Sequence, residues 1–130
     1  LFPEALPCLQ RLKQQGYWLA VATGKGRSGL DKAIAQTDTQ AFWLETACAS
    51  EYPSKPAPDM VLALCDRLGV EPEEAVVVGD TTHDLEMAAN AKIRAIAVTT
   101  GAHTAKQLSS MPHVAMLNSL AELPDVLETI

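Results

Sequence analysis

The stretch Ala75-Val-Val-Val-Gly-Asp-Thr-Thr-His-Asp84 decides the fold. It opens with a short apolar run of β-branched residues, which is typical of a strand buried on both faces of a sheet. Gly79 and Asp80 end this run, and the pattern of a short helix follows over residues 82–91. A buried strand that passes through a polar turn into a helix is the repeating unit of parallel α/β folds.

The same alternation continues on both sides of this stretch. The spacing of apolar residues predicts helices over residues 3–15, 28–36, 56–68, 82–91 and 117–130, and strands over residues 17–23, 41–49, 75–79 and 95–99. Strands separated by helices predict an α/β fold with a mostly parallel sheet and helices on both faces. Ligands of such sheets bind at the carboxyl ends of the strands, so the residues that follow each strand are the candidates for function.

Length and composition predict one domain and exclude several classes of function. The chain has 130 residues, a hydrophobic share of 48% and a net charge of −6, which argues against unspecific binding to nucleic acid or anionic membranes. No apolar run approaches the roughly 20 residues of a membrane helix, and the first residues lack the pattern of a signal peptide. Cys8, Cys48 and Cys65 have no C-x-x-C spacing, which predicts free thiols in a reducing cytoplasm and no zinc site.

The first candidate site is the turn Thr23-Gly-Lys-Gly26, which follows one predicted strand and precedes a helix. A hydroxyl, glycine N–H groups and a helix N-terminus in this order can cradle an anion such as phosphate. Gly24, Gly26 and Gly29 also match G-x-G-x-x-G, with Glu45 at a suitable distance for a ribose contact, so a dinucleotide site is an alternative. A third interpretation is a tight turn without a ligand.

Two further candidates follow the next strands. Lys55 precedes Pro56, which favours extended backbone and would let the lysine reach into a cleft; the alternative is an ordinary surface lysine. Asp80 and Asp84 flank the first turn of a predicted helix and could share one Mg²⁺ ion, which prefers oxygen ligands. Their alternative role is helix capping. A phosphate cradle, a lone cation and a carboxylate pair after successive strands together suit phosphoryl transfer.

These motifs resemble those of the haloacid dehalogenase superfamily, and of its phosphoglycolate-phosphatase-like members in particular. Val21-Ala-Thr-Gly-Lys25 is similar to the second motif, Ser54-Lys-Pro-Ala-Pro-Asp59 to the third and Val77-Val-Gly-Asp-Thr-Thr-His-Asp84 to the fourth. The resemblance implies a Rossmann-like core, with residues 1–130 forming a partial catalytic core without a cap domain. It implies that Thr23, Gly24 and Lys55 bind phosphate, that Lys55 and Asp80 are catalytic, and that Asp80 and Asp84 hold Mg²⁺.

The sequence departs from the family in one respect that affects both fold and chemistry. The first motif of the family is Asp-x-Asp, whose leading carboxylate attacks phosphorus, and no Asp-x-Asp occurs in this chain. In the family that motif ends a central strand, which would lie between the strands ending here at Thr23 and Gly79. The resemblance therefore implies an incomplete sheet. We expect the two flanking strands to pair directly, a dimer to swap elements, or a separate N-terminal fragment to supply the strand.

The functional expectation is the core of a Mg²⁺-dependent phosphatase acting on a small phosphate monoester such as phosphoglycolate. Without the Asp-x-Asp motif, the chain alone is expected to show little or no turnover. The alternatives are a phosphate-binding module without catalysis and a dinucleotide-binding fragment. His103, which follows the last predicted strand, is expected near the rim of the cleft.

Overall fold

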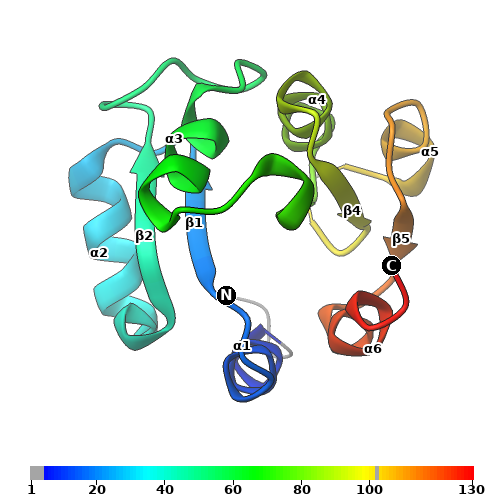
Figure 1. Ribbon diagram of the computed structural model, residues 1–130, viewed down its shortest axis with the longest axis horizontal. Helices are drawn as coiled ribbons and strands as arrows, with labels where there is room; N and C mark the ends of the chain where they lie inside the picture. Colours follow the sequence, from blue (N-terminus) through cyan, green and yellow to red (C-terminus); the bar gives the residue numbers. More distant parts are fainter. Residues whose placement is uncertain (1–4, 102) are drawn as a thin grey trace.

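The computed structural model describes residues 5–101 and 103–130 and shows the predicted alternation of strands and helices (Figure 1). The helices are α1 (Ala5–Gln14), α2 (Arg27–Thr37), α3 (Asp59–Leu68), α4 (Thr82–Ala91), α5 (Ala105–Leu108) and α6 (Leu123–Leu127). The strands are β1 (Leu19–Thr23), β2 (Trp43–Cys48), β3 (Val76–Gly79), β4 (Arg94–Val98) and β5 (Ala115–Leu117). Short 3₁₀ helices span Gln40–Phe42, Pro72–Glu74 and Leu120–Glu122.

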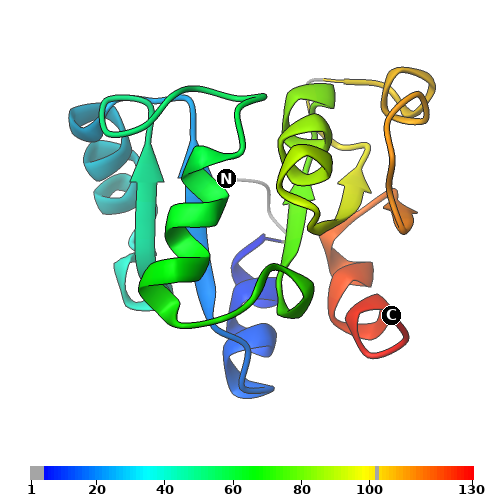
Figure 2. The ribbon, with the colours of Figure 1, turned by 45° about the horizontal axis from the view of Figure 1, so that its top comes forward.

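The strands form two parallel sheets rather than one. β1 pairs with β2, while β3, β4 and β5 pair in that order, and every one of these pairs is parallel. Figure 2 shows the two sheets side by side, with β1 and β3 as the strands nearest to the division. The expectation that the two flanking strands pair directly is wrong, because an apolar cavity separates β1 from β3. The α/β class and the incomplete sheet are as predicted.

Helices cover both faces of this arrangement, as the sequence predicts. On one face, α3 and α4 bury a large apolar cluster that includes Met60, Leu64, Leu85 and Met87. On the other face, α1 and α6 bury a smaller cluster around Ile96. The two helices of that second face are also joined by polar contacts, from Arg11 Nη2 to Asp125 Oδ1 at 2.6 Å and from Gln15 Nε2 to Glu128 Oε1 at 3.1 Å. No helix in the described ranges is long and apolar enough to cross a membrane.

The region after β4 differs most from the prediction. The predicted helix over residues 117–130 is partly wrong, because Leu117 ends β5, where it pairs with Val98 of β4. Ser119 then caps the 3₁₀ helix Leu120–Glu122 by accepting a hydrogen bond from the N–H of Ala121 at 3.1 Å. The three residues of β5 and the four of α5 are too short to show a reliable period in the sequence.

Candidate phosphate and metal site

The turn from β3 into α4 is fixed by a reciprocal cap. Thr81 Oγ1 accepts a hydrogen bond from the N–H of Asp84 at 3.2 Å, and Asp84 Oδ2 accepts one from the N–H of Thr81 at 3.2 Å. Asp84 Oδ2 also accepts from the N–H of Asp80 at 3.2 Å and from Thr81 Oγ1 at 3.0 Å. Thr81 is therefore the N-cap, and the alternative role of Asp80 as N-cap is wrong.

Gly79 lets this cap sit directly on the end of β3. A Cβ atom at Gly79 would lie 2.2 Å from the Cβ atom of Asp84, which is far inside van der Waals contact. Any larger residue at the end of the strand would push the first turn of α4 away from the sheet. The glycine at the end of β3 therefore has a steric explanation. Because it has no side chain, the carboxylate of Asp84 can lie directly at the sheet edge.

Lys55 reaches the same edge from the loop between β2 and α3. Its ammonium group forms an ion pair with Asp84 Oδ1, and the two side chains are only 20% and 9% exposed. The interpretation of Lys55 as an ordinary surface lysine is therefore not supported. Both oxygens of Asp84 have partners here, since Oδ2 holds the cap and Oδ1 holds Lys55. In this structure Asp84 therefore joins Lys55 to the first turn of α4.

The carboxylate of Asp80 is less engaged than that of Asp84. Its side chain makes no hydrogen bond with any residue in the ranges 5–101 and 103–130, and it lines a pocket of about 270 Å³. The pocket is lined by Ala22, Lys55, Val78, Gly79, Asp80, Asp84, Val98, Thr100 and Leu120. The structure thus brings Lys55, Asp80 and Asp84 together at one pocket, and their roles there stay predictions.

Thr100 is a candidate site residue that reasoning from the sequence missed. Its Oγ1 atom is buried and has no hydrogen-bond partner among the described residues, and Thr100 lines the same pocket as Asp80. A buried hydroxyl without a partner loses free energy unless a ligand or water satisfies it. The signal was present, because Thr99-Thr-Gly101 directly follows a buried strand just as Asp80 does. Gly101 permits this approach, since a Cβ atom there would lie 1.8 Å from Asp80 Oδ2.

His103 lies next to the pocket in a structural role. Its Nδ1 atom accepts a hydrogen bond from the N–H of Thr82 at 2.9 Å, and its own N–H donates to the carbonyl of Asp80 at 3.3 Å. These two bonds hold the loop after β4 against the first turn of α4. The expected position near the rim of the cleft agrees with this arrangement, while contact with a substrate remains a prediction.

Thr23 and Gly24 lie at the carboxyl end of β1, across the division between the sheets. Thr23 Oγ1 accepts a hydrogen bond from the N–H of Lys25 at 3.2 Å, which leaves its O–H free to donate. Neither residue lines the 270 Å³ pocket, although the preceding Ala22 does. The predicted phosphate-binding turn is therefore beside the Lys55 and Asp80 pocket but is separate from it in this structure.

The geometry does not favour a dinucleotide site at the same turn. The third glycine of the fingerprint normally permits close helix packing, yet a Cβ atom at Gly29 would meet only Lys25 Cβ at 3.8 Å. Glu45 pairs in register with Ala20, three residues before β1 ends, and forms an ion pair with Arg67 at 3.7 Å. Because each strand residue rises about 3.3 Å, Glu45 lies roughly 10 Å below the edge where a ribose would bind.

The site offers few but suitable ligands for a divalent cation. Within the described residues, no three His, Cys, Asp or Glu side chains gather into a ready metal cage. Mg²⁺ seldom needs such a cage, because it is usually held by one or two carboxylates together with water and phosphate oxygens. The unengaged carboxylate of Asp80 beside the unsatisfied hydroxyl of Thr100 fits that kind of ion.

Comparison with known proteins agrees with this geometry. Residues 1–98 match the profile of the haloacid dehalogenase-like hydrolases. The chain belongs to this family. A solved structure of a haloacid dehalogenase-like hydrolase from Bacteroides fragilis superposes with a TM-score of 0.89 at 30% identity, covering 95% of this chain and 59% of that one. Reasoning from the sequence thus identified both the family and its fold.

Among curated proteins, the haloacid dehalogenase-like chain is similar to several phosphatases. It is 36% identical over 125 residues to a protein named "Probable phosphatase IndB" from Dickeya dadantii, covering 95% of this chain and 54% of the relative. It is 30% identical over 102 residues to a phosphoglycolate phosphatase from Mannheimia succiniciproducens, covering 78% and 46%. The chain therefore spans about half the length of the curated relatives it matches.

Proposed function

We propose that this chain forms the phosphate- and Mg²⁺-binding half of a phosphatase that acts on a small phosphate monoester. The observation that carries the proposal is the pocket that Lys55, Asp80 and Thr100 line together. Lys55 brings a cation to it, and Asp80 brings a carboxylate without a hydrogen-bond partner among the described residues. The names of similar phosphatases support the reaction class, and among them phosphoglycolate is the substrate we propose.

Each residue has a role that follows from its position. Lys55 neutralises phosphate charge from a partly buried place, where a charge interaction is stronger than in bulk water. Asp80 and Asp84 would be the two carboxylates that hold Mg²⁺. The ion would supply positive charge to the phosphoryl oxygens. Thr23 donates its hydroxyl, and Gly24 its N–H, to a phosphate that bridges from the end of β1. Asp84 also orients Lys55 through their ion pair.

The chemistry of hydrolysis needs a group beyond these residues. The sequence contains no Asp-x-Asp pair, so we propose that the chain alone binds phosphate without turning it over. A phosphate-binding module without catalysis is the second candidate function, and the same absence favours it. The three cysteines are free in the structure, and the cytoplasm is the compartment we propose because thiols stay reduced there.

Calorimetric titration with phosphoglycolate, with and without Mg²⁺, tests the binding half of this proposal. We expect Mg²⁺ to strengthen binding in the parent chain, Asp80→Asn to abolish that gain, and Lys55→Met to weaken binding at least tenfold. Asp66→Asn and Lys32→Met change the same charges at exposed positions away from the pocket and should leave binding unchanged.

Release of inorganic phosphate from the same samples tests the second half. We expect no turnover above the rate without protein. Failure of phosphoglycolate and of inorganic phosphate to bind in the presence of Mg²⁺ would contradict the proposal. Thermal stabilisation by a nicotinamide dinucleotide instead would support the dinucleotide alternative.

A further inference from the structure

The turn after β1 and the turn after β2 lie side by side at the carboxyl edge of the two-stranded sheet. The last residues of the two strands, Thr23 and Cys48, are register partners. Just beyond them, the N–H of Ala49 donates a hydrogen bond to the carbonyl of Lys25 at 3.0 Å. This bond continues the contact past the ends of both strands, so the turn proposed to bind phosphate is attached to its neighbour.

The start of α2 takes its cap from the turn after β2. Its N-cap position is Gly26, which has no side chain that could accept a hydrogen bond. Instead, Ser50 Oγ accepts a hydrogen bond from the N–H of Arg27, the first helical residue, at 2.9 Å. Helix N-termini need such acceptors because their first N–H groups have no partner within the helix. A cap from 23 residues away therefore fixes the helix start to the second turn.

The side chain of Arg27 connects the same two segments a second time. Its Nη2 atom donates to Glu51 Oε1 at 2.8 Å, and its Nη1 atom donates to Thr46 Oγ1 of β2 at 2.9 Å. A longer contact of 3.3 Å joins Nη1 to Asp31, one turn further along α2. A guanidinium group suits this task because its donors form a fixed planar fork. Both terminal nitrogens bind protein oxygens, which argues against Arg27 as a direct phosphate ligand.

The turn after β1 has room around its glycines. Apart from its chain neighbours, a Cβ atom built on Gly24 or on Gly26 would meet no heavy atom of the described residues within 4 Å. Thr23 Oγ1 already accepts the N–H of Lys25, so its O–H is the group that remains to donate. The turn is therefore held by contacts with the β2 segment while its glycine backbone leaves space for a ligand.

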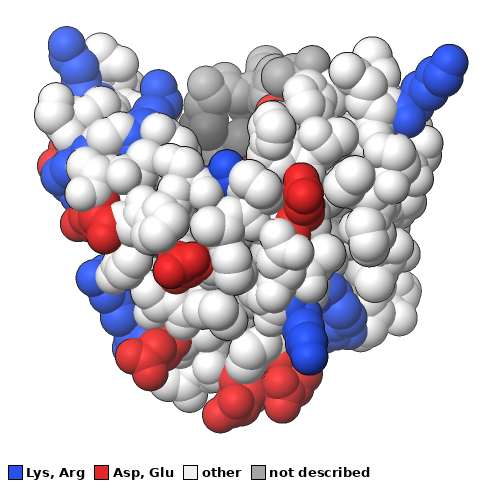
Figure 3. All heavy atoms as spheres, turned by 90° about the horizontal axis from the view of Figure 1, so that it is seen from above, with Lys and Arg blue, Asp and Glu red and all other residues white. Residues whose placement is uncertain are grey.

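The charges beside this turn separate two explanations for Arg27. Figure 3 shows acidic and basic side chains close together on the side of the molecule that carries α2 and β2. If Arg27 acted only through its charge, the loss of Glu51 or Asp31 would strengthen anion binding, because a repulsive carboxylate is removed. If Arg27 holds the turn, the loss of Glu51 weakens binding. The two explanations predict opposite signs for one substitution.

We propose that Arg27 is a positioning residue for the phosphate-binding turn. Its side chain on Glu51 and its N–H on Ser50 fix the backbone of residues 23–26, so that the donors of this turn are in place before phosphate arrives. Donors that are already ordered lose less conformational entropy on binding. The inference rests on the proposed function, because it concerns the same phosphate, and it assigns Arg27 no contact with that ligand.

The first readout is calorimetric titration of the intact 130-residue chain with inorganic phosphate in the presence of Mg²⁺. We expect Glu51→Ala to weaken phosphate binding by about threefold to fivefold, the upper range for an exposed ion pair. Glu51→Gln keeps an acceptor oxygen for Arg27 and should retain the affinity of the parent chain. Asp31→Ala is the matched control, because it removes a carboxylate that contacts Arg27 from α2 itself, and it should not weaken binding.

The second readout is NMR relaxation of the backbone amides without phosphate, which does not depend on ligand binding. We expect Glu51→Ala to lower the order parameters of residues 24–26, while Glu51→Gln and Asp31→Ala leave them unchanged. Ser50→Ala, which removes the cap of α2, should act in the same direction as Glu51→Ala. Urea denaturation checks that each variant is folded, and Ser50→Ala decides the question if Glu51→Ala is not.

Three outcomes would overturn the inference. Equal or tighter phosphate binding in Glu51→Ala would show that Arg27 does not act by holding the turn. An equal loss of affinity in Asp31→Ala would assign the effect to α2 as a whole. Unchanged order parameters in Glu51→Ala would show that the turn is fixed without Arg27. Failure of phosphate to bind the parent chain would instead contradict the proposed function, and the relaxation data would then decide whether Arg27 orders the turn.

Discussion

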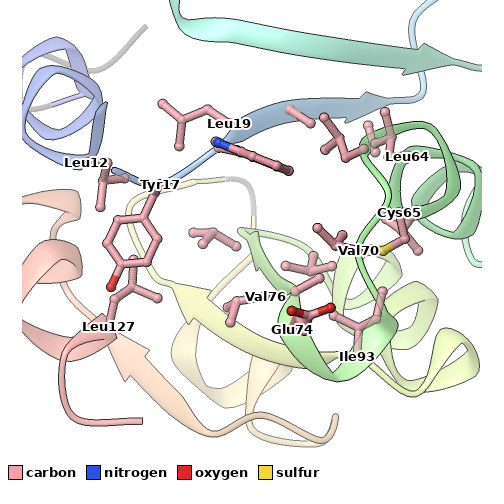
Figure 4. Close-up of a pocket in the computed structure, with 18 of the residues that line it drawn as sticks. Leu12, Tyr17, Leu19, Leu64, Cys65, Val70, Glu74, Val76, Ile93 and Leu127 are labelled. Atoms are coloured by element: carbon pink, nitrogen blue, oxygen red, sulfur yellow. The ribbon is translucent and has the colours of Figure 1, made fainter. Parts of the chain in front are cut away.

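β3 and β4 are adjacent, mostly apolar strands with different surroundings. Val78 of β3 pairs in register with Ile96 of β4, yet Val78 is 39% exposed and Ile96 is fully buried. β4 has a strand on each side, while β3 has β4 on one side and the apolar cavity of about 430 Å³ that separates it from β1 on the other (Figure 4). Their apolar runs alone would predict equal burial. The comparison teaches that the burial of a strand is set by its neighbours in the sheet as much as by its own residues.

The largest expected difference between the two strands is in amide hydrogen exchange. β4 amides should open only with global unfolding, which typically requires about 5 kcal/mol or more. β3 amides that face the cavity between β1 and β3 have no ladder partner among the described strands and should exchange roughly 10³-fold faster or more. NMR exchange rates at neutral pH measure this, and similar protection along both strands would contradict it.

The next largest difference is expected in the free energy of unfolding when the register partners Val78 and Ile96 are each replaced by alanine. Ile96→Ala is expected to lower the free energy of unfolding by about 2–5 kcal/mol, because the cavity it leaves is fully enclosed. Val78→Ala should lower it by less than about 1 kcal/mol, since the side chain already faces open space. Urea denaturation measures both values. An equal loss at the two positions would show that β3 is covered in solution.

A smaller effect is expected at the last register pair, Gly79 with Ala97. Gly79→Ala should destabilise the fold by about 1–3 kcal/mol, because the new methyl group collides with Asp84 and must displace the first turn of α4. It should also weaken phosphate binding by moving Lys55. Ala97→Gly is the control: it loses stability without such a collision, so phosphate affinity should be retained. Calorimetry and denaturation together distinguish the two.

The smallest effect concerns an exposed polar contact next to the β1–β2 sheet, between Arg27 at the start of α2 and Glu51 in the turn after β2. A hydrogen bond from Arg27 lowers the pKa of Glu51, so this pair stabilises the fold above the ordinary carboxyl pKa and loses its effect as pH falls through the lower folded value. Glu51→Gln should therefore slightly flatten the dependence of stability on pH below about 4.5, the ordinary value. Glu73→Gln is the exposed control. An unchanged profile in Glu51→Gln would contradict the expectation.

Much of the fold could be predicted because its signals are local. The apolar runs before Thr23 and Gly79 and the spacing of Met60, Leu64 and Leu68 placed strands and helices within a few residues of their observed bounds. The division between the sheets could be expected only through resemblance to a family. That the flanking strands remain apart depends on helices packing across both faces, which no single stretch of sequence records.

The position of the candidate pocket was predictable, but the contacts inside it were not. Lys55, Asp80 and Asp84 line one pocket because all three lie at the same sheet edge, and their roles stay predictions. The sequence could not show that Asp84 is shared between a helix cap and Lys55, since that depends on Thr81 and on a loop 29 residues away. Thr100 was missed because a threonine after a strand is common without a function.

The contact between α1 and α6 has a consequence for the order of folding. Each parallel pair, β1 with β2 and β3 with β4, is closed by a short crossover through one helix, whereas Arg11 and Asp125 are 114 residues apart. Because joining distant segments carries the greater entropy loss, we expect each pair to form early and the α1–α6 contact to form late. The last step of folding would then be the one that brings Leu12 of α1 and Leu127 of α6 together at one end of the cavity between β1 and β3.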